Sequence, residues 1–398
     1  MLGEVQLNSG QLNAISSICD WYKNPKRTFI FSGCAGSGKT LTIAKCRDYI
    51  DDKTAIAFCS FTGKATSVLR KRLIENNCLK SLDSCSTIHS LIYIPVVDSK
   101  TKKIIDWKRR DSLDTDLIII DEASMVDQDM YKDLCKYNIP ILAVGDSFQL
   151  PPINGNFSLL DNPDILLTKI CRQAENHPII KVSKFIREEG YLPFGVFGEN
   201  VAKVRKGDEC IYHFLNNTID FKDTIILCGT NKTRIKINNN IRKMLKFEGK
   251  YPNIGERVIC LKNNRNAKNC PIYNGVTGSV VMIADFKSHL ETEVEIDGEL
   301  DHYFGAVDKN SFLNLQPDLD HRKKVLRFNI DEKKSDIQYS EAPVDYFDFS
   351  YAITVHKSQG SEYNRVMVIE EWFQPETKMQ WLYTSCTRSK EQLLIVER

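Results

Sequence analysis

A glycine-rich octapeptide between an apolar run and a helical pattern constrains the fold of this chain more than any other feature. The run at 28–31 predicts a short buried strand, and 41–45 opens a helical pattern. The octapeptide matches G-x-x-x-x-G-K-[ST] and consists of Gly33, Cys34, Ala35, Gly36, Ser37, Gly38, Lys39 and Thr40. In such a turn, backbone N–H groups and a helix N-terminus face a phosphate chain. We therefore expect a nucleoside triphosphate as ligand, with Lys39 on its β- and γ-phosphates and Thr40 on Mg²⁺.

Bulk composition narrows the class of protein. A chain of 398 residues is longer than one ordinary domain, so two or more are expected, and a net charge of +2 confines any polyanion site to a local groove. The 13 cysteines form no C-x-x-C pair, which argues against zinc and for reduced thiols. No apolar run reaches the roughly 20 residues of a transmembrane helix. No targeting signal is recognised, so we expect a cytoplasmic protein of a bacterial or phage-infected cell, with no membrane partner.

Short apolar, β-branched segments recur along the chain, with helical patterns between many of them. They lie at 28–31, 54–59, 117–120, 139–144, 224–227 and 366–369. This alternation predicts an α/β fold with parallel sheets wound by helices.

Two regions depart from that alternation. Within 90–111, β-like runs at 91–97 and 103–107 flank a turn-like segment at 98–101 and predict a projecting hairpin. From about 278 to 344 the pattern alternates and predicts a small β-rich insertion.

Two acids follow the apolar strand at 117–120. Functional groups collect at the carboxyl ends of parallel strands, so Asp121 is expected to hold Mg²⁺ opposite Thr40. Glu122 is then placed to orient and deprotonate the attacking water. The pair is also compatible with a helix N-cap that carries an extra acid, but the upstream P-loop favours the catalytic interpretation.

Further motifs follow in a fixed order. Residues 121–127 and 144–152 resemble the second and third motifs of superfamily 1 helicases, most closely those of the RecD-like and Dda-like branch. The segments that resemble the other motifs of this family, from the N-terminal glutamine motif to the sixth motif, are 7–11, 61–65, 86–89, 167–173, 351–360 and 383–388. In the last of these, Ser385 and Cys386 stand where Gly-Val or Ala-Val is commoner in the family.

The resemblance implies two tandem RecA-like motor domains with ATP in the cleft between them. It assigns Gln11 to the adenine, Gly360 to nucleotide binding and Gln149 to sensing the γ-phosphate. Arg172 and Arg388, on the second domain, are implied as arginine fingers, whose planar guanidinium groups suit phosphoryl oxygens. Because such fingers require closure, hydrolysis would be tied to domain motion.

The resemblance also implies domain boundaries. Motor domain 1 would hold 1–89 and 112–165, the hairpin pin or wedge 90–111, motor domain 2 166–278 and 345–398, and a small SH3-like β-rich insertion 279–344. The Asn274-Gly275 pair, a tight turn with positive φ, precedes that insertion.

A translocating motor holds a single strand through phosphates and stacked bases rather than base edges. The residues that family position assigns to this contact, divided between both motor domains, are Thr62, Lys64, His89, Thr354 and His356. Trp107 lies in a basic cluster on the hairpin, and if this cluster splits the duplex, Trp107 or Tyr93 would stack on a base. That cluster fits a duplex-splitting wedge and a solvated basic face equally well.

The leading hypothesis is an ATP-dependent DNA helicase that moves along single-stranded DNA, 5′ to 3′ by family analogy, and unwinds duplexes. An ATPase that translocates and remodels protein–DNA complexes without unwinding is the alternative. A small-molecule kinase would explain Lys39 but not the matches at 351–360 and 383–388. Expected partners are single-stranded and tailed duplex DNA, together with replication or recombination proteins. A monomer is the family default.

Overall fold

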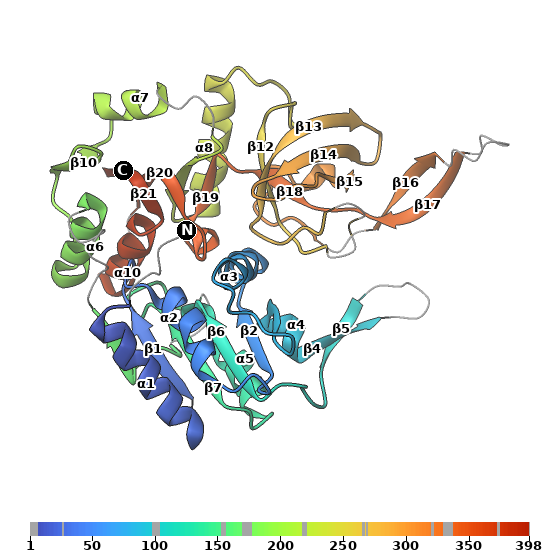
Figure 1. Ribbon diagram of the computed structural model, residues 1–398. Coiled ribbons are helices and arrows are strands. Elements are labelled where there is room, and N and C mark those ends of the chain that lie inside the picture. The colour runs from blue at the N-terminus through green and yellow to red at the C-terminus, as the bar shows by residue number, and fades with distance from the viewer. Residues whose placement is uncertain are drawn as a thin grey trace. The chain divides into compact units, whose positions relative to one another are not determined.

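The protein forms two compact units. The computed structural model describes residues 7–25, 28–97, 104–152, 157–168, 177–216, 221–264, 267, 270–319, 322–328, 337–371 and 375–397. The first unit contains Met1–Leu192 and Phe373–Thr387, and the second contains Pro193–Trp372 and Arg388–Arg398. Each unit has a β-sheet flanked by helices (Figure 1).

The first unit is built on a six-stranded sheet in the order β3-β2-β6-β7-β1-β8, in which every neighbouring pair is parallel. Its strands are β1 (Phe29–Gly33), β2 (Ile56–Ser60), β3 (Ser84–Thr87), β6 (Leu117–Asp121), β7 (Ile141–Gly145) and β8 (Ile165–Leu167). Its helices are α1 (Ser9–Lys23), α2 (Lys39–Cys46), α3 (Gly63–Glu75), α4 (Ile88–Ile92), α5 (Gln128–Cys135), α6 (Pro178–Glu189) and α10 (Pro375–Cys386), with 3-10 turns η1 (Arg47–Tyr49) and η2 (Ala123–Met125). The α/β prediction is confirmed here.

Apolar residues fill both faces of this sheet, which is why its strands read as continuous apolar runs. In β6, Leu117 and Ile119 join a core made with α1, α2 and α3. The alternate residues Ile118 and Ile120 join a second core with α4 and α5. Helices therefore cover both faces, and polar groups are left for the strand ends.

The hairpin predicted within 90–111 is present. Strands β4 (Tyr93–Val97) and β5 (Ile104–Arg109) pair antiparallel, with Tyr93 opposite Arg109. The expected turn at 98–101 lies outside the described residues.

The second unit contains a second six-stranded sheet in the order β19-β11-β20-β21-β10-β9. Its strands are β9 (Gly195–Gly198), β10 (Val201–Arg205), β11 (Thr224–Cys228), β19 (Ala352–Thr354), β20 (Tyr363–Glu370) and β21 (Ser389–Glu397). The pairs are parallel except for β9, which runs antiparallel at the edge. The helices of this unit are α7 (Glu209–Asn216), α8 (Asn231–Met244) and α9 (Val355–Ser358).

A five-stranded antiparallel sheet, β15-β14-β13-β12-β18, follows within the same unit. Its strands are β12 (Arg257–Cys260), β13 (Thr277–Asp285), β14 (Leu290–Ile296), β15 (Tyr303–Val307) and β18 (Phe347–Phe349), and the 3-10 turn η3 (Lys309–Ser311) follows β15. An isolated bridge joins Val307 of the edge strand β15 to Asp345, two residues before the other edge strand, β18, which brings the two edges together as in a small barrel. A separate hairpin pairs β16 (Arg322–Phe328) with β17 (Ile337–Pro343).

This sheet extends beyond the insertion expected at 279–344. Strands β12 and β18 lie outside that range, and β13 would be left as an open edge without β12. The turn expected at Asn274-Gly275 is present, since Val276 N donates to Tyr273 O (3.0 Å) and Gly275 has a φ of 89°.

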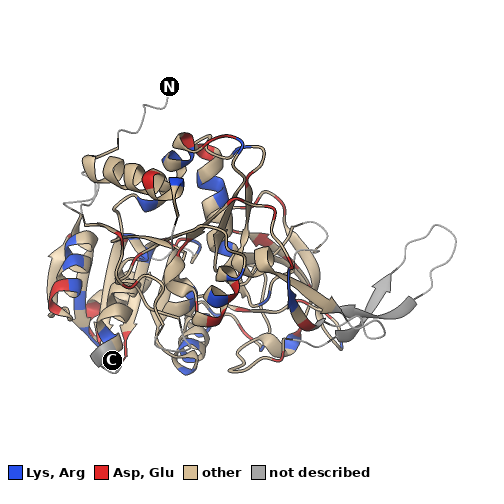
Figure 2. Cartoon of the chain, turned by 90° about the horizontal axis from the view of Figure 1, so that it is seen from below, with Lys and Arg blue, Asp and Glu red and all other residues tan. Residues whose placement is uncertain are grey.

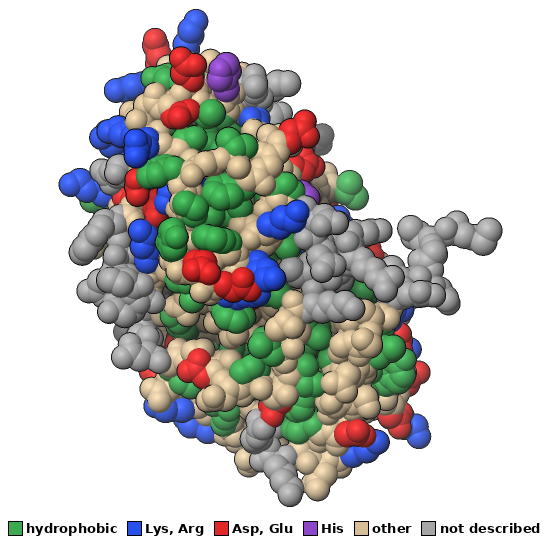
Figure 3. Space-filling view, turned by 90° about the vertical axis from the view of Figure 1, so that its left-hand side faces the viewer, with side chains coloured by type: hydrophobic (Ala, Val, Ile, Leu, Met, Phe, Trp, Pro, Cys, Tyr) green, Lys and Arg blue, Asp and Glu red, His purple; other side chains and the backbone are tan. Residues whose placement is uncertain are grey.

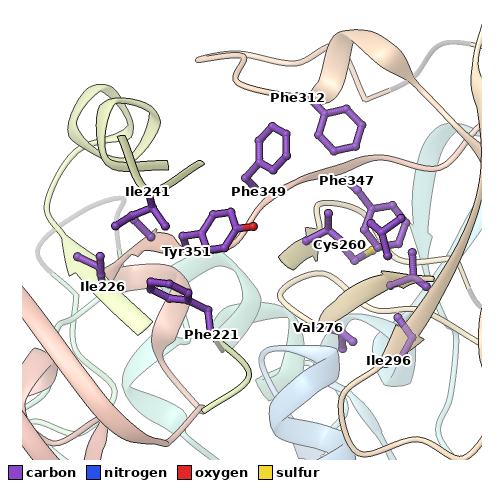
Figure 4. Close-up of a cluster of buried hydrophobic side chains, with 14 of the residues drawn as sticks. Phe221, Ile226, Ile241, Cys260, Val276, Ile296, Phe312, Phe347, Phe349 and Tyr351 are labelled. Carbon is purple, nitrogen blue, oxygen red and sulfur yellow. The ribbon is translucent and has the colours of Figure 1, made fainter. Parts of the chain in front are cut away.

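One hydrophobic core joins the two sheets of the second unit. Ile226 of β11 and Ile241 of α8 belong to the same cluster as Val276, Ile296 and Phe347 of the antiparallel region (Figure 4). We infer that the antiparallel sheet is an integral part of this unit and not a separately folded module.

The surface carries charge of both signs. Figure 2 shows basic and acidic residues spread over helices and loops, and Figure 3 shows both signs among hydrophobic side chains on one face. Within the described ranges, no helix is long and apolar enough to span a bilayer. The described residues also contain no cluster of three or more His, Cys, Asp or Glu suited to a metal, and their cysteines are free thiols.

Candidate nucleotide and nucleic-acid site

The glycine-rich octapeptide forms a tight loop between β1 and α2. Gly36 and Gly38 have φ values of 78° and 81°, which L side chains rarely adopt. A Cβ on Gly33 would lie 2.6 Å from Ser37 Oγ. The ammonium of Lys39 folds back over the loop and donates to Gly33 O (2.7 Å) and Cys34 O (3.2 Å). The loop thus holds a cation beside backbone N–H groups at a helix N-terminus, which is the arrangement that binds phosphate.

The two predicted acids lie at the carboxyl end of β6. Glu122 has φ 55° and ψ 42°, an uncommon left-handed conformation for a side chain of its size, and its N–H donates to Asp121 Oδ1 (3.0 Å). Burial, and then the nearby Glu122, raise the pKa of Asp121 to about 6, against the opposing effect of Lys39. Strained backbone and a shifted carboxyl pKa gather at functional sites more than elsewhere.

Arg72 is a site residue that the sequence patterns did not indicate. Its Nη1 donates to Thr40 Oγ1 at 3.2 Å, and its charge is among the influences that lower the pKa of Asp121. Arg72 lies on α3, which begins directly after Thr62. No spacing rule connects this arginine with the P-loop, because only the packing of α3 against α2 brings them together.

The loop after β7 supplies an amide. Gln149 is 5% exposed, and its Oε1 accepts no hydrogen bond from any described residue. Its backbone N–H donates to Asp146 O (3.1 Å). A buried amide oxygen without a donor is costly unless a ligand or water supplies one, so this side chain is suited to contact a bound group.

Gln11 lies against the P-loop, as the nucleotide assignment requires, but its amide already has partners. Its Nε2 donates to Ser37 O (3.3 Å), and its Oε1 accepts from Asn8 N (2.9 Å) in a capping box that starts α1. In this conformation Gln11 supports the loop, and its predicted contact with adenine stays a prediction.

Candidate DNA-binding residues follow β2 and β3, the two strands that lie on one side of β6 in the sheet. Thr62 caps α3 after β2 by accepting from Ala65 N (3.2 Å), Lys64 occupies the first turn of that helix, and His89 lies in α4 after β3. Ser60 of β2 is in register with Thr87 of β3 and with Asp121 of β6. In the parallel order β3-β2-β6-β7-β1, the carboxyl ends of the strands form one edge of the sheet. The candidate DNA residues therefore lie at the β3–β2 side of this edge, and the nucleotide residues lie at the β6–β7–β1 side.

An aromatic cluster lies at the base of the β4–β5 hairpin. The His89 ring is 4.8 Å from Tyr93 and meets Trp107 edge-on at 4.3 Å between centroids. Trp107 is 44% exposed, and Arg109 lies over the Tyr137 ring at 5.0 Å. Exposed rings beside arginine form a surface on which bases can stack.

Four of the remaining candidates, Thr354, His356, Gly360 and Arg388, belong to the second unit. Thr354 ends β19 and His356 lies in α9, where burial lowers the pKa of the imidazole. Gly360 has a φ of 73°, and Arg388 is buried with its Nη1 donating to Ser361 O (3.2 Å). Arg172 lies outside the described residues.

Comparisons with known proteins show that this chain is similar to helicases. The profile of an AAA domain matches residues 20–155, and that of a UvrD-like helicase C-terminal domain matches 349–396. The RecBCD enzyme subunit RecD of Buchnera aphidicola subsp. Acyrthosiphon pisum is 25% identical over 92% of this chain and 69% of its own. The ATP-dependent DNA helicase Pif1 of Campylobacter jejuni is 26% identical over 84% of this chain and 81% of its own.

A solved structure gives the same result for the fold. The Pif1 helicase from Bacteroides, in complex with ADP-AlF3 and ssDNA, superposes with a TM-score of 0.59 at 20% identity. The superposition covers 98% of this chain and 92% of that one. The fold with two RecA-like sheets is therefore shared along the whole chain.

Proposed function

The chain belongs to the superfamily 1 helicases, in the branch of RecD-like and Pif1-like proteins, and we propose that it translocates 5′ to 3′ on single-stranded DNA. It is an ATP-dependent DNA helicase. One observation carries the assignment of a DNA-dependent ATPase site: in the first unit, a single edge of one parallel sheet holds the P-loop, Gln149, the paired acids and the DNA candidates in that order. The direction of movement is proposed by analogy with the family.

The residues at this edge have complementary parts in ATP hydrolysis. Lys39 would leave the carbonyl groups that it contacts here and bind the β- and γ-phosphates. Glu122 would orient the attacking water and take its proton, and the free amide oxygen of Gln149 would register the γ-phosphate end of the nucleotide.

Mg²⁺ fits the same edge. A hydroxyl from Thr40 and a carboxylate from Asp121 are the hard oxygen ligands that this ion prefers, and it would neutralise charge on the phosphates. The Bacteroides Pif1 complex with ADP-AlF3 supports nucleotide binding in this family.

The grip on DNA would be independent of sequence. In the first unit Thr62 and Lys64 would bind phosphates, and His89 and Trp107 would stack on bases. In the second unit Thr354 and His356 would contact the same strand. The ssDNA in the Bacteroides Pif1 complex supports such a partner. The hairpin as wedge belongs to the same proposal.

The domain roles follow from the same resemblance. We assign motor roles to the two compact units and a wedge role to the hairpin, with the antiparallel sheet as a part of the second unit that includes β12 and β18. Arg172 and Arg388 are proposed as arginine fingers. A monomer, replication or recombination partners and a cytoplasmic location stay predictions.

The test is ATP turnover by purified protein with and without single-stranded DNA, beside unwinding of duplexes with a 5′ or a 3′ tail. We expect DNA to stimulate turnover and only the 5′-tailed duplex to be separated. Lys39→Ala is the matched inactive control, since it removes the phosphate-binding ammonium but leaves Thr62 and Lys64. Unwinding of the 3′-tailed duplex would reverse the direction, and stimulation without unwinding would favour the translocase. If no nucleic acid stimulates ATP turnover, the hypothesis of a nucleic-acid motor is refuted.

A further inference from the structure

A hydroxyl on α10 joins two loops of the nucleotide site. Tyr383 Oη donates to Asp146 Oδ2 (2.7 Å) and accepts the P-loop N–H of Ala35 (3.1 Å). Both side chains are buried in the first unit. Burial above all, and then Asp146, raise the pKa of Tyr383 well above its ordinary value, so the phenol stays a proton donor.

The carboxylate of Asp146 organises the segment that we call the sensor loop (146–150). Its Oδ1 accepts from Phe148 N (3.1 Å), and its backbone O accepts from Gln149 N (3.1 Å). At the far end of the loop, Leu150 N donates to Thr384 Oγ1 (2.9 Å). Two successive residues of α10 therefore hold the sensor loop: Tyr383 binds its first residue, Asp146, and Thr384 binds its last, Leu150. Tyr383 also binds the P-loop.

We propose that Tyr383 and Thr384 are positioning residues for ATP hydrolysis, which hold the amide of Gln149 in a fixed place relative to the P-loop. The inference rests on the proposed function and names residues that the motor needs beyond those touching the nucleotide. A hydrogen bond to a buried carboxylate is roughly twice as strong as one between neutral groups, so it can set the position of a short loop. Misplacement of a reacting group by about 1 Å can slow a reaction about 100-fold.

The position of α10 in the chain gives this contact a second consequence. The helix ends at Cys386, and Arg388, which follows two residues later, belongs to the second unit. The helix that holds the sensor loop therefore ends three residues before β21, which starts at Ser389. The contact of α10 with α6 keeps the helix packed in the first unit.

The chain offers a matched control for a purely structural role. Tyr303 Oη donates to Asp345 Oδ2 at the same 2.7 Å, and Tyr303 is likewise fully buried, but this pair lies in the antiparallel sheet of the second unit. Replacing either tyrosine by phenylalanine removes one hydroxyl from a buried Tyr–Asp pair. Only the pair at the sensor loop should affect the chemistry.

The experiment compares Tyr383→Phe and Tyr303→Phe with the wild type in steady-state ATP turnover with saturating single-stranded DNA, and in urea unfolding. We expect Tyr383→Phe to lower kcat about ten-fold or more while KM for ATP changes less than about two-fold, because ground-state contacts with the phosphates remain. Tyr303→Phe should leave both constants unchanged. Equal kcat values for the two variants would overturn the inference.

A second pair of variants decides the matter if Tyr383→Phe does not fold. Thr384→Val keeps the shape but removes the acceptor for Leu150 N, whereas Thr384→Ser retains an acceptor. A lower kcat in Thr384→Val, with recovery in Thr384→Ser, supports the inference, and identical kcat values in the two overturn it. A wild type that shows no DNA-stimulated turnover is a failure of the proposed function itself, which these variants then do not address.

Discussion

Replacing Arg242 by alanine should destabilise the second unit as a whole. The Arg242 guanidinium, 4% exposed on α8, donates from Nε and Nη2 to the two carboxylate oxygens of Glu256 (2.8 and 2.9 Å). It also donates to Gly249 O and Tyr251 O (both 2.9 Å) and lies 4.1 Å from the centre of the Phe349 ring. This side chain thus links α8 to the segment before β12 and to β18.

The expected loss follows from what the truncation leaves behind. Glu256 is fully buried, and breaking a buried ion pair from one side costs about 3–5 kcal/mol because the remaining charge has lost its partner. Glu256 keeps donors in Asn253 N (2.9 Å) and Tyr351 Oη (3.2 Å), so we expect the lower end, about 3 kcal/mol. Adding Glu256→Gln to Arg242→Ala should recover part of this, with a coupling of about 1–3 kcal/mol.

Urea unfolding combined with hydrogen exchange resolves where the loss occurs. Because Ile226 and Ile241 share one core with Val276 and Phe347, strands β11 and β20 should lose protection together with β13 and β14 (Figure 4). Lys222→Ala, which breaks an exposed pair with Glu295, is the control and should change stability by no more than about 0.5 kcal/mol. A loss below about 1 kcal/mol, or one confined to the antiparallel sheet, would refute the reasoning.

Other predictions concern the site. Glu122→Gln should retain ATP and DNA binding but slow turnover about 100-fold or more, and near-normal turnover would contradict its role as base. Because burial and Glu122 raise the pKa of Asp121 to about 6, a proton competes with Mg²⁺ as the pH falls through that value. The Mg²⁺ concentration for half-maximal ATPase should therefore rise about ten-fold per pH unit below it, and a flat profile between pH 7 and 5 would reject this assignment. Trp107→Ala, which opens the aromatic cluster with His89, should impair unwinding more than DNA-stimulated ATPase, and equal loss in both assays would count against the wedge.

Much of the fold could be predicted because its signals are local. The strands β1, β2, β6, β7, β11 and β20 each overlap a short apolar run, since a strand covered on both faces needs apolar residues at every position. The turn at Gly275 and the β4–β5 hairpin could also be predicted, because neighbouring residues specify them. The extent of the antiparallel sheet was not, because β12 and β18 become its members only by pairing across a separation of nearly 90 residues.

The sequence by itself determined which residues are expected to touch a phosphate chain, because Gly33 to Thr40 must be contiguous for one loop to enclose it. It also determined the acids at the end of β6, which adjoin their strand. Only the tertiary structure decided that Arg72 lies on Thr40 and that Tyr383 joins Asp146 across 237 residues of chain. Such contacts depend on where two helices pack against a sheet, and no short-range pattern of residues encodes that position.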